Sequence, residues 1–517
     1  MHSPLTRLLT SKLKHRSFLC KGHKEALGIL SAYRHLSKSN NKTPSWQEGL
    51  EEDDHPDTLE VLKSLRAKHH YHGKAVDDPK KHGVMVIEPD YKWGRHRFKK
   101  ATAEHRLEEA CGLVQAISNW AVNTSAIEPI RKVDTKSFFG KGKIEELQER
   151  ISQAKQIEEN TLDAVYLDVG QLTPRQHKEL EAFWDVKVFD RFGIVLQIFK
   201  ERAQTAEAKI QVELAEIPYI RSRLVGDDSV EFDQQRGGTH FISGSGETQL
   251  ERERRVLTGR ELKLKKKLEA LRKHREHVRH ERQKRHIPVV SVVGYTNAGK
   301  TTLIKSLTGD NKMQPDNKLF ATLDVTAHPG KLPSGMQVLF VDTVGFVSDL
   351  PPELVESFSA TLEDMVDSDL VVHVRDVCHP EQEAQNEDVL SVLQQLKLRP
   401  ALMKTIINVY NKIDKCSAEH LQDTVSHMHT CEVQISALHG MGLDLLRKHI
   451  EEGIMKSTGR MIKRVVIPPD GPQLSWLYHE ATVHETVADE DGFITATVII
   501  DEATNNKFEK KFGKLLH

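Results

Sequence analysis

A glycine-bounded loop in the middle of the chain has the composition of a phosphate-binding site. It matches the pattern GxxxxGK[ST] in full and consists of Gly294, Tyr295, Thr296, Asn297, Ala298, Gly299, Lys300 and Thr301. Glycine lets backbone N–H groups approach phosphate oxygens without a Cβ clash, and a helix that begins at the end of the loop adds partial positive charge. We expect Lys300 to reach the β- and γ-phosphates of a nucleotide and the Thr301 hydroxyl to ligate Mg²⁺.

Two further segments supply groups for the metal and the terminal phosphate. The first offers Thr322 as a second hydroxyl for Mg²⁺, with Thr326 as the alternative, and comprises Phe320, Ala321, Thr322, Leu323 and Asp324. The second comprises Asp342, Thr343, Val344 and Gly345. Here the Asp342 carboxylate would hold a water on the metal, and the Gly345 N–H would meet the γ-phosphate. Lys300, Thr322 and Gly345 are therefore the predicted catalytic residues, and Thr301 and Thr322 the predicted metal ligands.

Two last segments predict guanine as the base. They consist of Asn411, Lys412, Ile413 and Asp414, and of Ser436, Ala437 and Leu438. A carboxylate at 414 can accept hydrogen bonds from guanine N1–H and N2–H₂, which adenine cannot offer, and the backbone of 436–438 could reach guanine O6. Each short segment is weak alone, but all five occur in the order a GTPase needs, four of them directly after apolar, strand-like runs. This order favours GTP over ATP.

The residue after Gly345 departs from the Ras-like pattern. Ras-like enzymes have a Gln there that orients the attacking water, whereas this chain has Phe346. A phenyl ring cannot hydrogen-bond water. We therefore expect slow intrinsic hydrolysis, with the catalytic arrangement completed by another element or a partner.

The surrounding elements predict a multidomain α/β protein. With 517 residues the chain is long enough for about three domains at roughly 100–200 residues each. Short apolar runs typical of strands alternate with helical patterns. The expected strands are 84–87, 163–168, 186–189, 288–293, 338–341, 406–410, 464–467 and 493–500, with 491–492 as a hairpin turn before the last of them. The expected helices are 103–121, a helix that begins at Thr173-Pro174, 192–217 and 302–307.

Charge and cysteine usage exclude several classes of protein. No run approaches the 18 or so apolar residues of an ordinary transmembrane helix, so no membrane span is expected. Five cysteines without CxxC spacing support neither a disulfide framework nor a zinc site.

Residues 1–46 hold nine Lys or Arg and one acid, Glu25, which is typical of an organelle transit peptide. A disordered basic tail that binds RNA is the alternative.

A second basic region precedes the phosphate loop. Residues 251–286 hold 15 Lys or Arg against 6 acids and carry a thin apolar stripe formed by Leu257, Leu262, Leu264, Leu268 and Leu271. Two antiparallel helices with a turn near Gly259 or further on would suit this pattern. The excess charge favours a polyanion partner over a solvated helix face. The predicted RNA-binding residues are Arg236, Gly237, Gly238, His240 and Phe241 in a glycine-rich loop, and Arg252, Arg254, Arg255, Lys263, Lys265 and Lys266 in the helices.

The motifs together resemble the HflX branch of the translation-factor-related GTPases. The resemblance includes residues 294–301, 320–324 and 342–346, and residues 244–251, which match the family's GPGETQLE segment with Ser245 in place of Pro. Upstream, residues 139–143, 202–203 and 209–215 also resemble the family. The segment Asp324-Val-Thr-Ala-His328 lacks the Arg of the family's DPTxR, and the loop before residue 244 is less glycine-rich than is usual in the family.

This resemblance implies the order of the domains. We expect a transit peptide at 1–46, a linker at 47–83, an N-terminal α/β domain at 84–225, a glycine-rich loop at 226–246, a basic helical hairpin at 247–286, a P-loop GTPase domain at 287–458 and a small C-terminal α/β domain at 459–517.

The resemblance also implies a partner and a location. Family members bind the large ribosomal subunit near the peptidyl transferase centre and split ribosomes or assist late subunit maturation. With the basic leader, the expected site of action is the large subunit of the mitochondrial ribosome, in the matrix, with GTP/GDP and Mg²⁺ bound and the protein a monomer. A regulatory GTPase with a protein effector, or an RNA-remodelling NTPase that uses the N-terminal domain, are the alternatives. Residues 84–225 contain no second phosphate loop.

Overall fold

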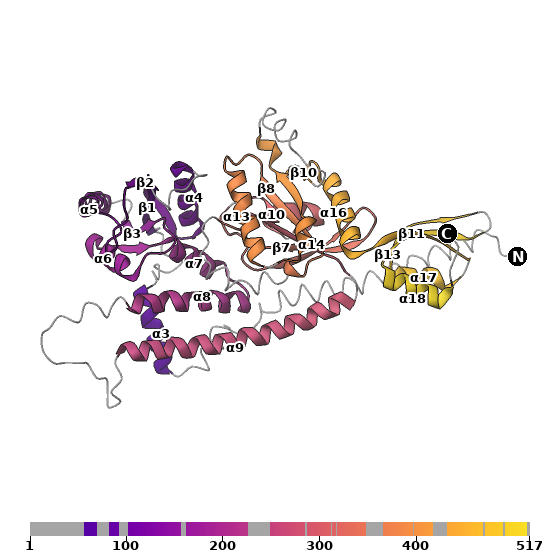
Figure 1. The fold of residues 1–517 in the computed structure, drawn as a ribbon, viewed down its shortest axis with the longest axis horizontal. Helices are drawn as coiled ribbons and strands as arrows, with labels where there is room; N and C mark the ends of the chain where they lie inside the picture. Colours follow the sequence, from indigo (N-terminus) through magenta and orange to yellow (C-terminus); the bar gives the residue numbers. More distant parts are fainter. Residues whose placement is uncertain are drawn as a thin grey trace.

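Within its described residues, the computed structural model shows three β-sheets that follow one another along the molecule, with a long helix lying beneath the first two (Figure 1). It describes residues 56–69, 82–92, 102–156, 162–225, 249–284, 287–347 except 312 and 317, 365–416 except 397, 432–489 except 469 and 470, and 492–513. The predicted leader, much of the predicted linker and the glycine-rich loop lie outside these residues. In the described part of the chain, no helix is both long and apolar enough to cross a lipid bilayer.

The first sheet consists of four parallel strands in the order β2-β1-β3-β4. The strands are β1 (His82–Tyr91), β2 (Trp120–Ile130), β3 (Leu162–Leu167) and β4 (Lys187–Phe189). The helices are α4 (Ala103–Ala116), α5 (Lys141–Lys155), α6 (Pro174–Trp184) and α7 (Arg191–Arg202). Alternate residues of β1 pack on opposite faces: Val84 and Val86 share a core with α4 and α7, whereas Met85 and Ile87 share one with α5 and α6.

Sequence patterns predicted most of these elements. The start of α6 at Thr173-Pro174 is confirmed, with a capping box formed by Thr173 and Gln176. The helix expected at 103–121 ends at Ala116, and β2, which was not predicted, follows it. β2 lies at the sheet edge, and most of its residues are partly or fully exposed. It therefore lacks the continuous apolar run that marks a buried strand.

The helical region after the first sheet differs from the predicted single helix at 192–217 and from the predicted hairpin at 247–286. The helix predicted at 192–217 is two helices, α7 and α8 (Ala206–Val225), and the break lies at 203–205. The basic hairpin predicted at 247–286 is wrong, because this segment is one 36-residue helix, α9 (Gln249–Lys284). The helix that pairs with α9 is α8, and α3 (Pro56–His69) packs against both (Figure 1).

An apolar stripe joins α9 to its neighbours. Leu257, Leu264 and Leu268 of α9 are buried against residues of α3 and α8. The predicted stripe was correct at these positions and wrong at Leu262, which is 57% exposed. Ion pairs reinforce the contact between α8 and α9, from Arg260 to Glu213 at 2.8 Å, Arg221 to Glu261 at 2.6 Å and Arg275 to Glu207 at 2.8 Å.

Gly259 provides a test of the single helix. It lies inside α9 with open space around its Cα, so Gly259→Ala should stabilise α9 by about 0.5–1 kcal/mol. Slower amide hydrogen exchange in α9 would show this effect. Gly459→Ala is the matched control and should destabilise the protein. Gly459 also has open space for a Cβ, but its φ of +65° is a conformation that residues with a side chain rarely adopt. Faster exchange in α9 of the Gly259→Ala variant would instead support a turn at that position.

In the part of the chain that the structure describes, the central sheet has six strands in the order β10-β9-β8-β5-β7-β6, and only β6 is antiparallel to its neighbour. The strands are β5 (Val289–Gly294), β6 (Thr326–Lys331), β7 (Gln337–Asp342), β8 (Leu370–Asp376), β9 (Ile407–Asn411) and β10 (Glu432–Gln434). The other elements are α10 (Lys300–Thr308), α13 (Gln382–Gln395), α14 (Pro400–Lys404), the 3₁₀ helix η2 (Ile413–Lys415) and α16 (Leu443–Thr458). β5 is buried along its whole length, as its apolar run predicted.

The third sheet is antiparallel and has the order β11-β13-β12. Its elements are β11 (Met461–Ile467), β12 (Thr482–Ala488), β13 (Ile494–Ile500), α17 (Pro472–Glu480) and α18 (Glu502–Phe512). The two helices cover one face of the sheet, where Val498 and Phe508 belong to a shared core. The strands predicted at 464–467 and 493–500 are present, and the fold class is the predicted multidomain α/β with a P-loop sheet.

Candidate guanine-nucleotide site

The phosphate loop connects the end of β5 to the start of α10, and two of its glycines have no room for a side chain. Gly294 has a φ of +152°, and a Cβ there would lie 2.2 Å from the Val374 carbonyl oxygen. Gly299 has a φ of +96°, and its Cβ would lie 2.3 Å from Asn411 Nδ2. The conformation of the loop is therefore fixed by close contacts with β8 and β9 as well as by its own glycines.

Lys300 lies buried within this loop. Its Nζ donates hydrogen bonds to the carbonyl oxygens of Gly294 at 3.1 Å and Tyr295 at 2.8 Å. Burial lowers the pKa of Lys300 to about 8, although nearby Asp342 opposes this effect. A phosphate in the loop would add negative charge beside the ammonium and raise its pKa again.

Three oxygen-bearing side chains meet beside the loop. Thr301 Oγ1 donates to Asp342 Oδ2 at 2.7 Å, Thr322 Oγ1 donates to the same oxygen at 3.3 Å, and the two hydroxyl oxygens are 3.1 Å apart. The alternative, Thr326, lies in β6, where its hydroxyl hydrogen-bonds to His328 Nε2 at 3.0 Å. Of the two candidates, Thr322 is therefore the one that lies beside Thr301 and Asp342.

These residues fit a magnesium ion. Asp342 is 1% exposed, its Oδ1 has no hydrogen-bond partner among the described residues, and burial raises the pKa of its carboxyl group. A buried carboxylate oxygen without a partner is costly unless a cation or water satisfies it. Hydroxyl and carboxylate oxygens are the ligands that Mg²⁺ prefers, either directly or through water.

The segment after β7 crosses directly over the phosphate loop. A Cβ at Gly345 would lie 2.8 Å from Thr296 Cγ2 and 3.1 Å from Lys300 Nζ. The next residue, Phe346, is 4% exposed and belongs to the hydrophobic core. Its carbonyl oxygen accepts a hydrogen bond from the Thr296 N–H at 2.6 Å. The Phe346 side chain is therefore used for packing, which agrees with the expectation that it does not orient water.

Asn411 ties the base-recognition segments to the phosphate loop. Its Nδ2 donates to the Ala298 carbonyl oxygen at 2.9 Å, and its Oδ1 accepts from the Ala437 N–H at 3.0 Å. In η2, Asp414 Oδ1 accepts a hydrogen bond from Ser436 Oγ at 2.6 Å, and this bond lowers the pKa of the exposed carboxyl group. The predicted segments 411–414 and 436–438 thus lie side by side.

A disulfide borders this end of the site. It joins Cys378, just after β8, to Cys416, just after η2, with a Cα–Cα distance of 5.6 Å. The expectation that the cysteines support no disulfide is therefore wrong for this pair. Their separation of 38 residues gave no spacing signal, because only the meeting of the ends of β8 and β9 brings them together.

Several predicted nucleotide-binding residues, Asp324 among them, direct their side chains elsewhere. The Thr343 hydroxyl donates to the Val292 carbonyl oxygen at 2.8 Å, inside the sheet. The Phe320 ring is 1% exposed and packs edge-to-face on Phe199 of α7, with ring centroids 4.9 Å apart. The Tyr295 hydroxyl donates to Glu109 of α4. Only the backbone of these residues is left to contact a nucleotide.

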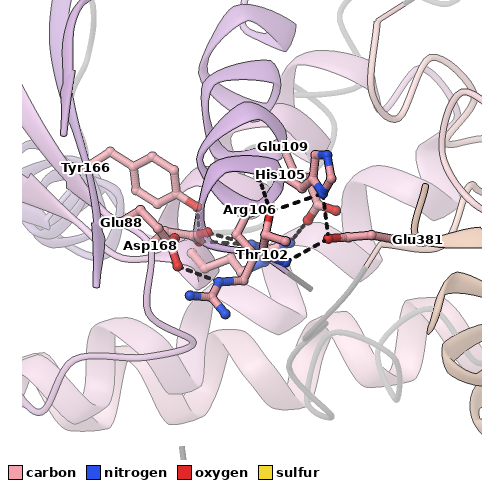
Figure 2. Close-up of polar contacts among 9 residues, drawn as sticks. Glu88, Thr102, His105, Arg106, Glu109, Tyr166, Asp168 and Glu381 are labelled. Atoms are coloured by element: carbon pink, nitrogen blue, oxygen red, sulfur yellow. Dashed lines mark hydrogen bonds and ion pairs between the residues drawn. The ribbon is translucent and has the colours of Figure 1, made fainter. Parts of the chain in front are cut away.

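Glu109 belongs to a buried polar cluster at the carboxyl ends of β1 and β3 (Figure 2). Arg191 pairs with both Glu109 and Asp168, and its Nη1 lies 2.9 Å from each Asp168 oxygen. Burial and the neighbouring Asp168 raise the pKa of Glu88 to about 9, although Arg106 donates to it at 2.6 Å. Sequence reasoning missed this cluster, since its members come from separate elements without characteristic spacing.

The amino end of α4 touches the central part of the molecule as well. Glu381, at the start of α13, accepts a hydrogen bond from the Thr102 N–H at 3.2 Å, and it lies 3.2 Å from His105 Nδ1 (Figure 2). α4 therefore contacts the nucleotide-site half of the protein through its first turn as well as through Glu109.

The predicted RNA-binding residues divide into two groups. Those of the glycine-rich loop, Arg236, Gly237, Gly238, His240 and Phe241, lie outside the described residues. Those of α9 are described: Arg252 and Arg254 are partly buried, whereas Arg255, Lys263, Lys265 and Lys266 are exposed. Lys265 pairs with Glu261 of the same helix at 2.6 Å.

Comparison with known families agrees with this geometry. Four family profiles match consecutive parts of the chain, and they are described as "GTP-binding GTPase N-terminal" over residues 104–200, "GTP-binding GTPase Middle Region" over 202–282, "50S ribosome-binding GTPase" over 289–412 and "HflX C-terminal domain" over 421–517.

Individual relatives cover most of the chain. A Xenopus laevis protein named "Putative GTP-binding protein 6" is 47% identical over 435 residues, which span 84% of this chain and 80% of the relative. A protein of Lacrimispora saccharolytica named "GTPase HflX" is 38% identical over 398 residues, which span 77% of this chain and 90% of the relative. A solved structure titled "crystal structure of SsGBP and GDP complex" is 24% identical, with a TM-score of 0.41, and covers 73% of this chain and 99% of its own. The chain is a GTP hydrolase that belongs to the HflX family of GTPases.

Proposed function

We propose that this GTPase binds the large subunit of the mitochondrial ribosome near the peptidyl transferase centre and acts there in ribosome splitting and recycling or in late subunit assembly. The proposal rests mainly on the charge and packing of α9. This helix buries one leucine stripe and bears a local excess of nine positive charges over residues 251–286, counted as 15 basic minus 6 acidic residues. The matching profile "50S ribosome-binding GTPase" supports the same partner class. The basic leader supports the mitochondrial location.

The geometry of the nucleotide site supports a definite division of roles. Lys300 and the backbone of the phosphate loop would hold the phosphates, and Asp414 would select guanine. Thr301, Thr322 and Asp342 would hold Mg²⁺, which supplies charge neutralisation at the β- and γ-phosphates when bound. The Gly345 N–H would contact the γ-phosphate. Because Phe346 is packed in the core, no side chain at that position aligns water, and we expect subunit contact to complete the arrangement and accelerate hydrolysis.

Salt dependence of subunit binding tests the partner. A triple variant with Lys263, Lys265 and Lys266 changed to Gln should bind subunits more weakly. Each phosphate that the variant no longer neutralises should make the slope of log affinity against log salt shallower by up to about one unit. Co-sedimentation of the full chain with purified subunits across a salt series measures the slope.

The matched control removes three exposed lysines elsewhere. Lys448, Lys456 and Lys507 lie on α16 and α18 and are exposed, so their change to Gln should leave the slope unchanged. If both triple variants bind like the parent at every salt concentration, α9 is a solvated spacer. The alternative of a regulatory GTPase with a protein effector would then be the better account.

A further inference from the structure

The segment that carries Thr322 is fixed to the amino end of α8. Asp324 Oδ2 accepts a hydrogen bond from the Gln204 N–H at 2.9 Å, and Asp324 Oδ1 accepts one from Thr205 Oγ1 at 2.5 Å. The Thr205 N–H lies within 3.4 Å of both carboxylate oxygens. Thr205 Oγ1 in turn accepts from the Ala208 N–H at 3.1 Å, so Thr205 caps α8 while it binds Asp324.

The position of this carboxylate is electrostatically favourable. The first N–H groups of a helix lack intrahelical acceptors, and the helix dipole places partial positive charge there. Asp324 thus places a negative charge at the amino end of the 20-residue helix α8, although Asp324 and Thr205 are 119 residues apart in sequence. Bonds from neutral donors to a carboxylate are stronger than bonds between neutral groups, so this is a firm attachment.

The other end of the same segment is fixed as well. Phe320 packs on Phe199 of α7, and the preceding Leu319 lies against Gly112 of α4, where a Cβ would come within 3.2 Å of Leu319 Cδ1. Thr322 lies between these two attachments, with its hydroxyl 3.3 Å from Asp342 Oδ2 and 3.1 Å from Thr301 Oγ1. Fixing a loop residue costs backbone entropy, which these contacts offset before the metal binds.

We infer that Asp324 and Thr205 form a positioning pair that holds Thr322 where it ligates Mg²⁺. The inference rests on the proposed role of Thr322 in metal binding. Because α8 also packs along α9 through the leucine stripe and the Arg260–Glu213 ion pair, the same contact joins the nucleotide site to the basic helix. Neither Asp324 nor Thr205 touches the reacting atoms in this assignment.

Mg²⁺ dependence of GTP hydrolysis tests the pair. Thr205→Val keeps the shape of the side chain but removes its hydroxyl, and Asp324→Asn replaces a charged acceptor by a neutral amide. Each should raise the Mg²⁺ concentration at half-maximal kcat about tenfold, the effect of losing one hydrogen bond to a charged group. GDP affinity at saturating Mg²⁺ should stay within about twofold. Thr205→Ser retains the hydroxyl and should restore the parent value.

Thr173→Val is the matched control for loss of a helix cap. Thr173 caps α6 through the Gln176 N–H, as Thr205 caps α8 through Ala208, but Asp324 is not among its partners. This variant should lose stability while keeping the Mg²⁺ dependence of the parent. A role of Thr205 confined to stabilising a helix would make Thr205→Val and Thr173→Val behave alike.

Thr322→Ala separates failure of the inference from failure of the proposed function. If Thr322→Ala leaves the Mg²⁺ dependence unchanged, the proposed metal site is wrong. If Thr322→Ala shifts it but Thr205→Val and Asp324→Asn match the parent, the positioning pair is overturned. A double variant, Thr205→Val with Asp324→Asn, should shift the dependence no further than the larger single change, because the two side chains act through one shared contact. The Thr205 variants alone decide the question if substitution of Asp324 prevents folding.

Discussion

Asp414→Asn should weaken GTP binding at least about a hundredfold and make xanthosine triphosphate the preferred nucleotide. The wild-type carboxylate is an acceptor for guanine N1–H and N2–H₂, and hydrogen bonds to charged groups contribute about 1.5–3 kcal/mol each. An Asn amide can present an N–H in place of one acceptor, which matches the C2 carbonyl of xanthine. The Ser436 hydroxyl, 2.6 Å from Asp414 Oδ1, holds the side chain in place for either base.

Fluorescence titration with labelled GTP and XTP measures this exchange of preference. Asp444→Asn is the matched control, because Asp444 is a solvent-exposed carboxylate in the first turn of α16. It should keep the GTP preference of the parent. An Asp414→Asn protein that binds GTP with parental affinity would remove Asp414 from the guanine site.

The nucleotide segments were predictable from sequence because their information is local. Four of the five polar segments directly follow an apolar strand, and parallel strands present their carboxyl ends at the same edge of the sheet. Once β5, β7, β9 and β10 pair in one sheet, Lys300, Asp342 and Asp414 must lie along that edge. Backbone contacts such as those of Gly294 and Gly299 need particular residue types at fixed spacing, which leaves a readable pattern.

The contacts that join α4 and the amino end of α8 to loops of the central part were not predictable in this way. The bond from Tyr295 to Glu109 spans 186 residues, and the bond from Thr205 to Asp324 spans 119. A single carboxylate, hydroxyl or tyrosine on a helix is equally compatible with a solvated surface. The partner of α9 was unreadable for the same reason: periodicity shows that a helix has an apolar stripe, but not which helix covers it.

Gly345→Ala should reduce GTP hydrolysis at least about a hundredfold while GDP binding is retained. Its methyl group would lie 2.8 Å from Thr296 Cγ2, 3.0 Å from Thr296 Cα and 3.1 Å from Lys300 Nζ. Thr296 cannot withdraw easily, since its N–H is bonded to the Phe346 carbonyl oxygen at 2.6 Å. The segment after β7 that carries Gly345 must therefore move away from the phosphate loop, and the Gly345 N–H moves with it.

The expected size of this effect follows from the chemistry at the γ-phosphate. Loss of one preorganised N–H donor to a developing charge typically costs about 10²–10³ in kcat. GDP has no γ-phosphate, so its affinity should change by only a few fold, and single-turnover hydrolysis beside GDP titration separates the two. Gly142→Ala is the control, because no atom of the described residues lies within 4 Å of its added Cβ. A Gly345→Ala variant that hydrolyses GTP at the parental rate would show that the phosphate loop and the segment after β7 can separate without loss of catalysis. The Gly345 N–H would then not be the donor to the γ-phosphate.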